Sequence, residues 1–78
     1  MEYSLYRISP AGDHILIGSG TGRDLFQVTP NFISAIHSDM GAGDVTYPDF
    51  DPEHSTETIR VYHMTGGTNH YVVLEACV

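Results

Sequence analysis

The sequence predicts a small α+β protein, in which a single antiparallel sheet of about four strands (ββαββ) has one helix packed on one face. Two pairs of apolar runs, rich in β-branched and aromatic residues, are each joined by a short glycine-containing turn. Between the two pairs stands a segment whose apolar residues have helical spacing. At 78 residues the chain has room for one domain, which we expect to span residues 1–78.

The first hairpin is expected near the start of the chain. Tyr3 to Ser9 is rich in aromatic and β-branched residues, and His14 to Gly18 returns as the second strand. Between them, Pro10-Ala11-Gly12 suits a three-residue turn in which the glycine takes the left-handed position. Counting back from a closing Ser9–Asp13 pair places Tyr6 opposite Leu16 and Leu5 opposite Ile17.

A helix is expected from Pro30 to Met40. Thr29 can cap it, Pro30 suits the first helical position, and Gly41 is the expected stop. The residues that share its apolar face are Phe32, Ile33, Ile36 and Met40. Before this helix, the glycine-rich segment Gly18–Gly22 predicts a flexible loop. For Asp24–Val28 the sequence allows two structures, a short third strand or a single turn.

The second hairpin is expected from strands at Glu57–Met64 and His70–Cys77, with Gly67-Thr68 as a type II′ turn. That turn sets the register of the two strands. Arg60 then lies opposite Glu75, which is a favourable pair of opposite charges. The other pairs expected are Val61 with Leu74, Ile59 with Ala76, and Tyr62 with Val73.

One helix covers only one face of this sheet, and both faces of the second hairpin are apolar. We expect the helix to cover Ile59, Val61, Val72, Leu74 and Ala76. The opposite face would then present Tyr62, Met64, Tyr71, Val73 and Cys77, which is more apolar than an ordinary wet sheet surface. Two interpretations of this apolar face stay open. Either the Gly41–Ser55 loop folds over it, or a partner protein or a second copy of the chain docks on it.

The charge balance limits the classes of partner. The chain has no lysine, and ten carboxylates outnumber three arginines, for a formal net charge of −7. Such a field repels nucleic-acid and membrane phosphates and attracts basic surfaces. The single cysteine and the absence of a long apolar stretch or signal sequence favour a reducing compartment. We therefore expect a cytoplasmic protein that binds neither nucleic acid nor membrane directly.

No motif for catalysis or cofactor binding stands out, so we expect no catalytic residue, no metal site and no cofactor. The spacing in Gly18–Gly22 is wrong for a dinucleotide loop, and no lysine exists for a phosphate loop. His63 and His70 flank the last turn and could approach each other, but zinc needs three or four converging ligands. A small metal-binding protein or enzyme that uses the histidines and the Asp49–His54 segment remains an alternative.

Six of the ten carboxylates lie between Asp39 and Glu57, a stretch without a basic residue. This stretch is either a solvated loop that keeps the protein soluble or an imitation of a phosphate backbone that occupies a basic groove. Aromatic residues within it would serve as apolar anchors. The partner-binding residues so predicted are Asp39, Asp44, Tyr47, Asp49, Phe50, Asp51, Glu53 and Glu57, with Tyr62 and Tyr71 on the apolar sheet face.

In size, acidity, lack of lysine and lack of a catalytic motif, the chain resembles the small proteins that phages use against host defences, of which anti-CRISPR proteins are the best-known group. The resemblance is one of general character over the whole chain and assigns no role to any residue. It implies a non-enzymatic inhibitor in the host bacterial cytoplasm, which binds a CRISPR effector and blocks nucleic-acid recognition or cleavage. A further alternative is a structural subunit that oligomerises, for example as a homodimer.

Overall fold

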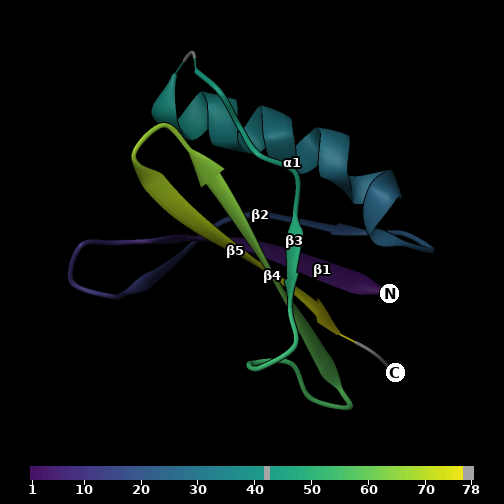
Figure 1. Cartoon of the computed structure of the whole chain (residues 1–78). Coiled ribbons are helices and arrows are strands. Elements are labelled where there is room, and N and C mark those ends of the chain that lie inside the picture. Colours follow the sequence, from purple (N-terminus) through teal and green to yellow (C-terminus); the bar gives the residue numbers. More distant parts are fainter. Residues whose placement is uncertain (42, 77–78) are drawn as a thin grey trace.

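The computed structural model describes residues 1–41 and 43–76, except for the side chain of Met40. This part of the chain forms one five-stranded antiparallel sheet, in the strand order β2-β1-β5-β4-β3, with one helix (Figure 1). The elements are β1 (Glu2–Ile8), β2 (His14–Thr21), α1 (Leu25–Met40), β3 (Asp49–Asp51), β4 (Ile59–Gly66) and β5 (Asn69–Ala76). The predicted α+β class is confirmed. A short fifth strand, β3, is added from the segment predicted to be a loop.

The first hairpin has the predicted turn and contains one bulge. Gly12 has a φ of 89° and donates its N–H to the carbonyl of Ser9 at 2.8 Å. Tyr6 lies opposite Leu16, as predicted. The expected pairing of Leu5 with Ile17 is wrong, because Leu5 lies opposite Gly18. Ile17 is the extra residue of a β-bulge, which shifts the register by one position.

The predicted flexible loop is instead a strand, since Gly18 to Thr21 continue β2 beneath α1. A Cβ atom added at Gly18 would lie 3.7 Å from the Cβ of Ala35, and one at Gly20 would lie 3.4 Å from Cγ1 of Val28. The helix therefore packs directly on the backbone of this strand. A side chain longer than that of alanine would push the helix away from the sheet.

Helix α1 begins before the predicted start, and Asp24–Val28 contains its N-cap and first turn. Asp24 is the cap, and its carboxylate accepts a hydrogen bond from the backbone N–H three residues later at 3.2 Å. Thr29, the predicted cap, lies inside the helix and donates its hydroxyl to the carbonyl of Leu25 at 2.8 Å. Pro30 is also interior, where its missing N–H leaves out one helical hydrogen bond.

The predicted end of the helix and its buried stripe are confirmed. Gly41 has a φ of 84° and donates its N–H to the carbonyl of His37 at 2.7 Å. Phe32 and Ile36 are buried and Ile33 is half-buried against them, while Val28 extends the stripe by one turn. The side chain of Met40, the last predicted member of the stripe, lies outside the described residues.

The second hairpin has the predicted register, and Arg60 lies opposite Glu75. Gly67 has a φ of 58°, while no described non-glycine residue has a positive φ, so the turn has the signs of type II′. The strands are shifted slightly from the predicted bounds, and Cys77, the predicted last strand residue, lies outside the described residues. The confirmed pairs are Val61 with Leu74, Ile59 with Ala76, and Tyr62 with Val73.

The two faces of this hairpin are the reverse of those predicted. Helix α1 packs on the face of Tyr62, Met64, Tyr71 and Val73, and the face of Ile59, Val61, Val72, Leu74 and Ala76 lies on the other side. The helix therefore covers most of the tyrosine-rich face, and Val45 of the predicted loop packs against the same core.

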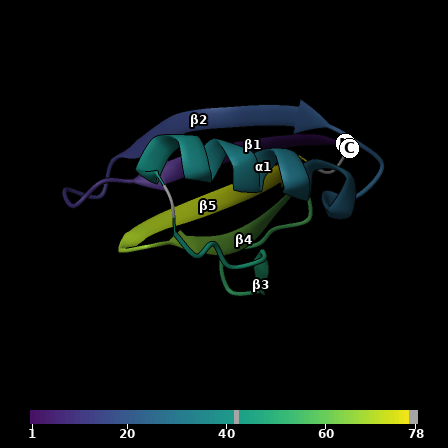
Figure 2. The ribbon, with the colours of Figure 1, turned by 90° about the horizontal axis from the view of Figure 1, so that it is seen from above.

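A polar contact also joins this face to the helix. The carboxylate of Asp39, near the end of α1, accepts hydrogen bonds from the hydroxyl of Tyr71 and from Nη1 of Arg7, each at 2.8 Å. Both partners stand on the helix-facing side of the two central strands, where they are direct neighbours in the β1–β5 pairing. We call these three residues the Asp39 clasp. Seen from above, α1 overlies the middle of the sheet, and β4 and β3 extend beyond it (Figure 2).

Ile36 is fully buried in this core, and Ile36→Ala should lower the free energy of unfolding by about 2–5 kcal/mol, the usual cost of a large-to-small change in a core. Denaturation with urea would measure the loss. Ile15→Ala is the matched control, because Ile15 is 39% exposed on β2, and it should cost much less. Equal losses in the two variants would contradict this packing of the helix.

Candidate functional site

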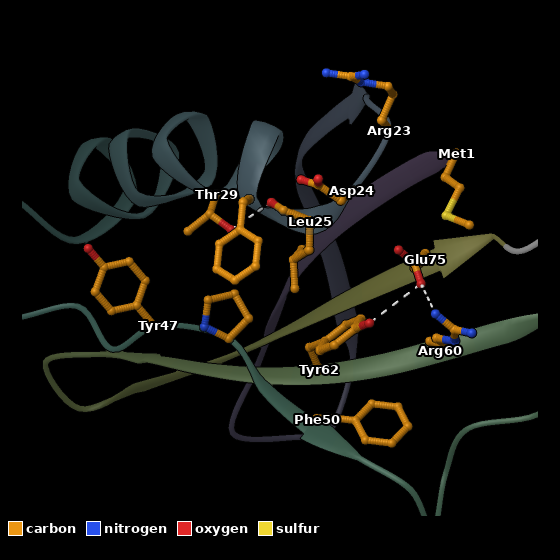
Figure 3. Close-up of a pocket in the computed structure, with 12 residues that line it drawn as sticks. Met1, Arg23, Asp24, Leu25, Thr29, Tyr47, Phe50, Arg60, Tyr62 and Glu75 are labelled. Carbon is orange, nitrogen blue, oxygen red and sulfur yellow. Dashed lines mark hydrogen bonds and ion pairs between the residues drawn. The ribbon is translucent and has the colours of Figure 1, made fainter.

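A pocket of about 440 Å³ lies where β4 and β3 extend beyond the helix. The first turn of α1 forms one side of it, and Tyr47, Phe50 and Tyr62 line the other (Figure 3). Leu25 and Phe26 contribute from the helix. We call this site the aromatic pocket, because four of these five residues have aromatic rings.

Three of the rings are exposed to solvent to an unusual degree. Phe26 is 83% exposed, Tyr47 is 73% exposed and Phe50 is 48% exposed. Phe50 also contacts the ring of Tyr62, with the ring centroids 5.6 Å apart. Large apolar side chains that gather around a concave site are typical of a surface that binds a partner or ligand.

The floor of the pocket is polar, and its carboxylate is hydrogen-bonded. Glu75 is only 3% exposed, and its Oε1 lies 3.5 Å from Nη1 of Arg60 and 3.4 Å from the hydroxyl of Tyr62 (Figure 3). Burial, and then the charge of Glu75, raise the pKa of Tyr62. Burial, followed by a hydrogen bond with Glu75, also raises the pKa of Tyr3. Both phenols therefore stay neutral at physiological pH, and the hydroxyl of Tyr62 donates a hydrogen bond to the carboxylate.

The predicted partner-binding acids fall into two groups. Asp39 is held in the Asp39 clasp with its side chain 17% exposed, and Asp51 is 13% exposed and bonded to histidines. These two carboxylates are not presented to a partner, contrary to the prediction. The acids whose residues are exposed are Asp44, Asp49, Glu53 and Glu57.

The predicted aromatic residues divide in the same way. Tyr47, Phe50 and Tyr62 line the aromatic pocket, whereas Tyr71 is fully buried under the helix and is not available to a partner. The prediction missed Leu25 and Phe26, because it did not place their segment in a helix. The signal was present in the sequence, since Asp24 is a good N-cap residue directly before them.

A second group of polar side chains, the histidine cluster, lies on the sheet face opposite the helix. Oδ2 of Asp51 accepts hydrogen bonds from Nε2 of His63 at 2.6 Å and from Nδ1 of His54 at 2.7 Å. Nδ1 of His63 lies 3.0 Å from Nε2 of His70, so these two histidines do approach each other across the hairpin. Among the described residues, no three histidine, cysteine or acidic side chains surround a common point.

No family model matches the chain, no curated protein is significantly similar to it, and no solved structure matches it. Within the described residues, no helix is long and apolar enough to cross a membrane.

The histidine cluster should make folding stability depend on acid pH. The hydrogen bond from His63 is the main cause that lowers the pKa of Asp51 to about 2, from an ordinary value of 3.8, while burial opposes the shift. Ionised Asp51 therefore stabilises the fold above about pH 4, and this contribution is lost as the pH falls towards about 2.

Thermal unfolding of the wild type and Asp51→Asn across this range would test this dependence. The difference in Tm should be largest above about pH 4 and close to zero near pH 2. Asp49→Asn, at an exposed position in the same strand, is the matched control and should show a smaller difference. A difference for Asp51→Asn that stays constant down to pH 2 would contradict the role of the His63 hydrogen bond.

Proposed function

We propose that this protein is a non-enzymatic inhibitor that docks through the aromatic pocket and the acids beside it onto a basic surface of a nucleic-acid-binding protein. The observation that supports this most directly is the meeting of three exposed aromatic rings at one pocket of a molecule whose net charge is −7. Aromatic side chains seated in well-packed sites provide much of the energy of protein interfaces.

Each exposed ring has an acidic residue close to it in the chain. Asp24 precedes Phe26 and Asp44 precedes Tyr47. Asp49 stands directly before Phe50, but because side chains alternate along a strand it points to the opposite sheet face, where it lies opposite His63. Asp24, Asp44 and Asp49 are all exposed to solvent, and Asp24 also lines the pocket. An interface with apolar anchors and a negative surround is complementary to an apolar protrusion flanked by lysine or arginine.

The charged side chains in the lining of the pocket balance one another. Arg23 and Arg60 line it together with Asp24 and Glu75; Arg60 is paired with Glu75, and the side chain of Arg23 points away from the other lining residues (Figure 3). The net negative charge of the molecule therefore lies outside this lining. That overall charge favours a basic protein surface over an acidic partner or a free nucleic acid.

A groove that binds nucleic acid is the basic surface that best matches these features, because it is built to neutralise a dense row of phosphates. The exposed acids would act as a partial mimic of that row, and the rings would supply anchorage. The general resemblance to phage counter-defence proteins makes a CRISPR effector complex the first partner to test. Occupation of its groove would block nucleic-acid recognition, and cleavage with it.

The first test removes charge and leaves the rings in place. A variant with Asp44→Asn, Asp49→Asn, Glu53→Gln and Glu57→Gln should fold normally, because exposed charges contribute little to stability. Surface plasmon resonance on a guide-loaded effector complex should show a slower on-rate for this variant. Raising the salt from about 50 to about 200 mM should weaken the wild type more than the variant, because fewer charges remain to be screened.

Target DNA should compete with the wild type for the same site. Unchanged on-rates in the charge variant, together with no competition from DNA, would refute the mimicry. A wild type that binds no effector complex would refute this choice of partner.

The second test removes the anchors. Phe26→Ala and Tyr47→Ala should each weaken binding by about 2 kcal/mol or more, roughly a thirtyfold rise in Kd, through faster dissociation. Both rings are exposed, so Tm should change little. Leu16→Ala is the matched control, because Leu16 is 58% exposed but lies on β2, away from the pocket. Equal weakening by all three changes would argue against the aromatic pocket as the interface.

A further inference from the structure

We infer that His63 and His70 form a binding site for one divalent transition-metal ion, and that Cu²⁺ binds there most tightly. The ligand atoms are Nδ1 of His63 and Nε2 of His70, which face each other across the β4–β5 hairpin. The site lies on the opposite sheet face from the aromatic pocket and does not depend on the proposed inhibitor function.

The separation of the two nitrogens is the main geometric argument. They are 3.0 Å apart. Two nitrogens bound to one ion at about 2.0–2.1 Å are about 2.9 Å apart for a right angle at the metal, and about 3.3 Å apart for a tetrahedral angle. The observed distance is that of an N–H···N hydrogen bond and lies close to both values. Small rotations of the two rings would therefore be enough for both nitrogens to bind one ion. His70 would bind it through Nε2 after the proton on that nitrogen has moved to Nδ1 of the same ring.

The outer hydrogen bonds prepare His63 for this role. Its Nε2 donates to Oδ2 of Asp51 at 2.6 Å, so in the neutral ring Nδ1 holds a lone pair that faces His70. Asp51 is itself fixed, since its Oδ1 accepts the backbone N–H groups of Glu53 at 3.0 Å and His54 at 3.2 Å. A carboxylate that orients a metal-binding histidine in this way is a common feature of metal sites and strengthens binding.

The surroundings also favour a cation. The two ligands stand on neighbouring strands of a regular hairpin, in which His63 pairs with Val72 and His70 with Thr65. Asp49 lies directly opposite His63 in the β3–β4 pairing and adds negative charge beside the site. With two protein ligands, the remaining positions on the ion would be filled by water. We therefore expect an open site that binds more weakly than a closed four-ligand site.

Titration of the full chain with Cu²⁺ would test this assignment by calorimetry and electron paramagnetic resonance. The wild type should bind one ion per chain, with a spectrum that reports two coordinated nitrogens. His63→Gln and His70→Gln should each lower the affinity by at least about tenfold, and Asp51→Asn should lower it by about 10–100-fold. The tightness of binding should follow the order Cu²⁺ above Ni²⁺ and Zn²⁺.

Matched controls separate this site from other sources of copper binding. His14→Gln and His37→Gln change histidines outside the cluster and should leave the affinity unchanged, as should acetylation of the Met1 amine. Circular dichroism would confirm that each variant is folded. If His63→Gln does not fold, His70→Gln still tests the assignment, because His70 is exposed and its replacement should not disturb the fold. Full affinity in folded His70→Gln, or an equal loss in the control variants, would overturn the assignment.

Discussion

The pairing of β1 with β5 is the contact on which the rest of the structure depends. The β1–β2 and β4–β5 hairpins form from neighbouring residues, and β3 adds to the second of them. Only the β1–β5 ladder, which runs from Glu2–Ala76 to Ile8–His70, joins the two halves into one sheet. It sets Leu5 beside Val73 in the buried layer under the helix. The same ladder sets Arg7 beside Tyr71, so that Asp39 can bind both side chains.

The features that were predictable from the sequence are the ones that neighbouring residues determine. Gly12 and Gly67 specify their turns because each supplies a positive φ at the position that needs one. Once the second turn is known, counting alone places Arg60 opposite Glu75 and brings His63 near His70. The buried stripe of α1 is likewise a local pattern. The turns, the strand register and the apolar stripe of the helix do not depend on how the two hairpins pack together.

The wrong predictions concern features that depend on contacts between residues far apart in the sequence. Alternation along β4 and β5 leaves two apolar faces, and only contacts between separate elements distinguish them, namely the apolar core under α1 and the Asp39 clasp. Gly18–Gly22 has the composition of a loop, but β2 continues as far as Thr21, where Val28 and Ala35 of the helix pack against the glycine backbone. Pro30 suggested a helix start, yet the Asp24 cap and the packing of Val28 outweigh the one hydrogen bond that the proline omits. The aromatic pocket was only partly predictable, since it draws residues from three separate segments.

The central position of β5 also has a consequence for the order of folding. During synthesis the first hairpin and the helix leave the ribosome well before β5 does, so the inner edge of β1 has no strand to pair with in the meantime. The buried tyrosine and valine side chains that the helix needs beneath it arrive with that same late strand. Closing the sheet thus requires a contact across nearly the whole described chain, and such distant pairing slows folding. The early half of the molecule must therefore stay open, with its apolar surfaces uncovered, until β5 has been synthesised.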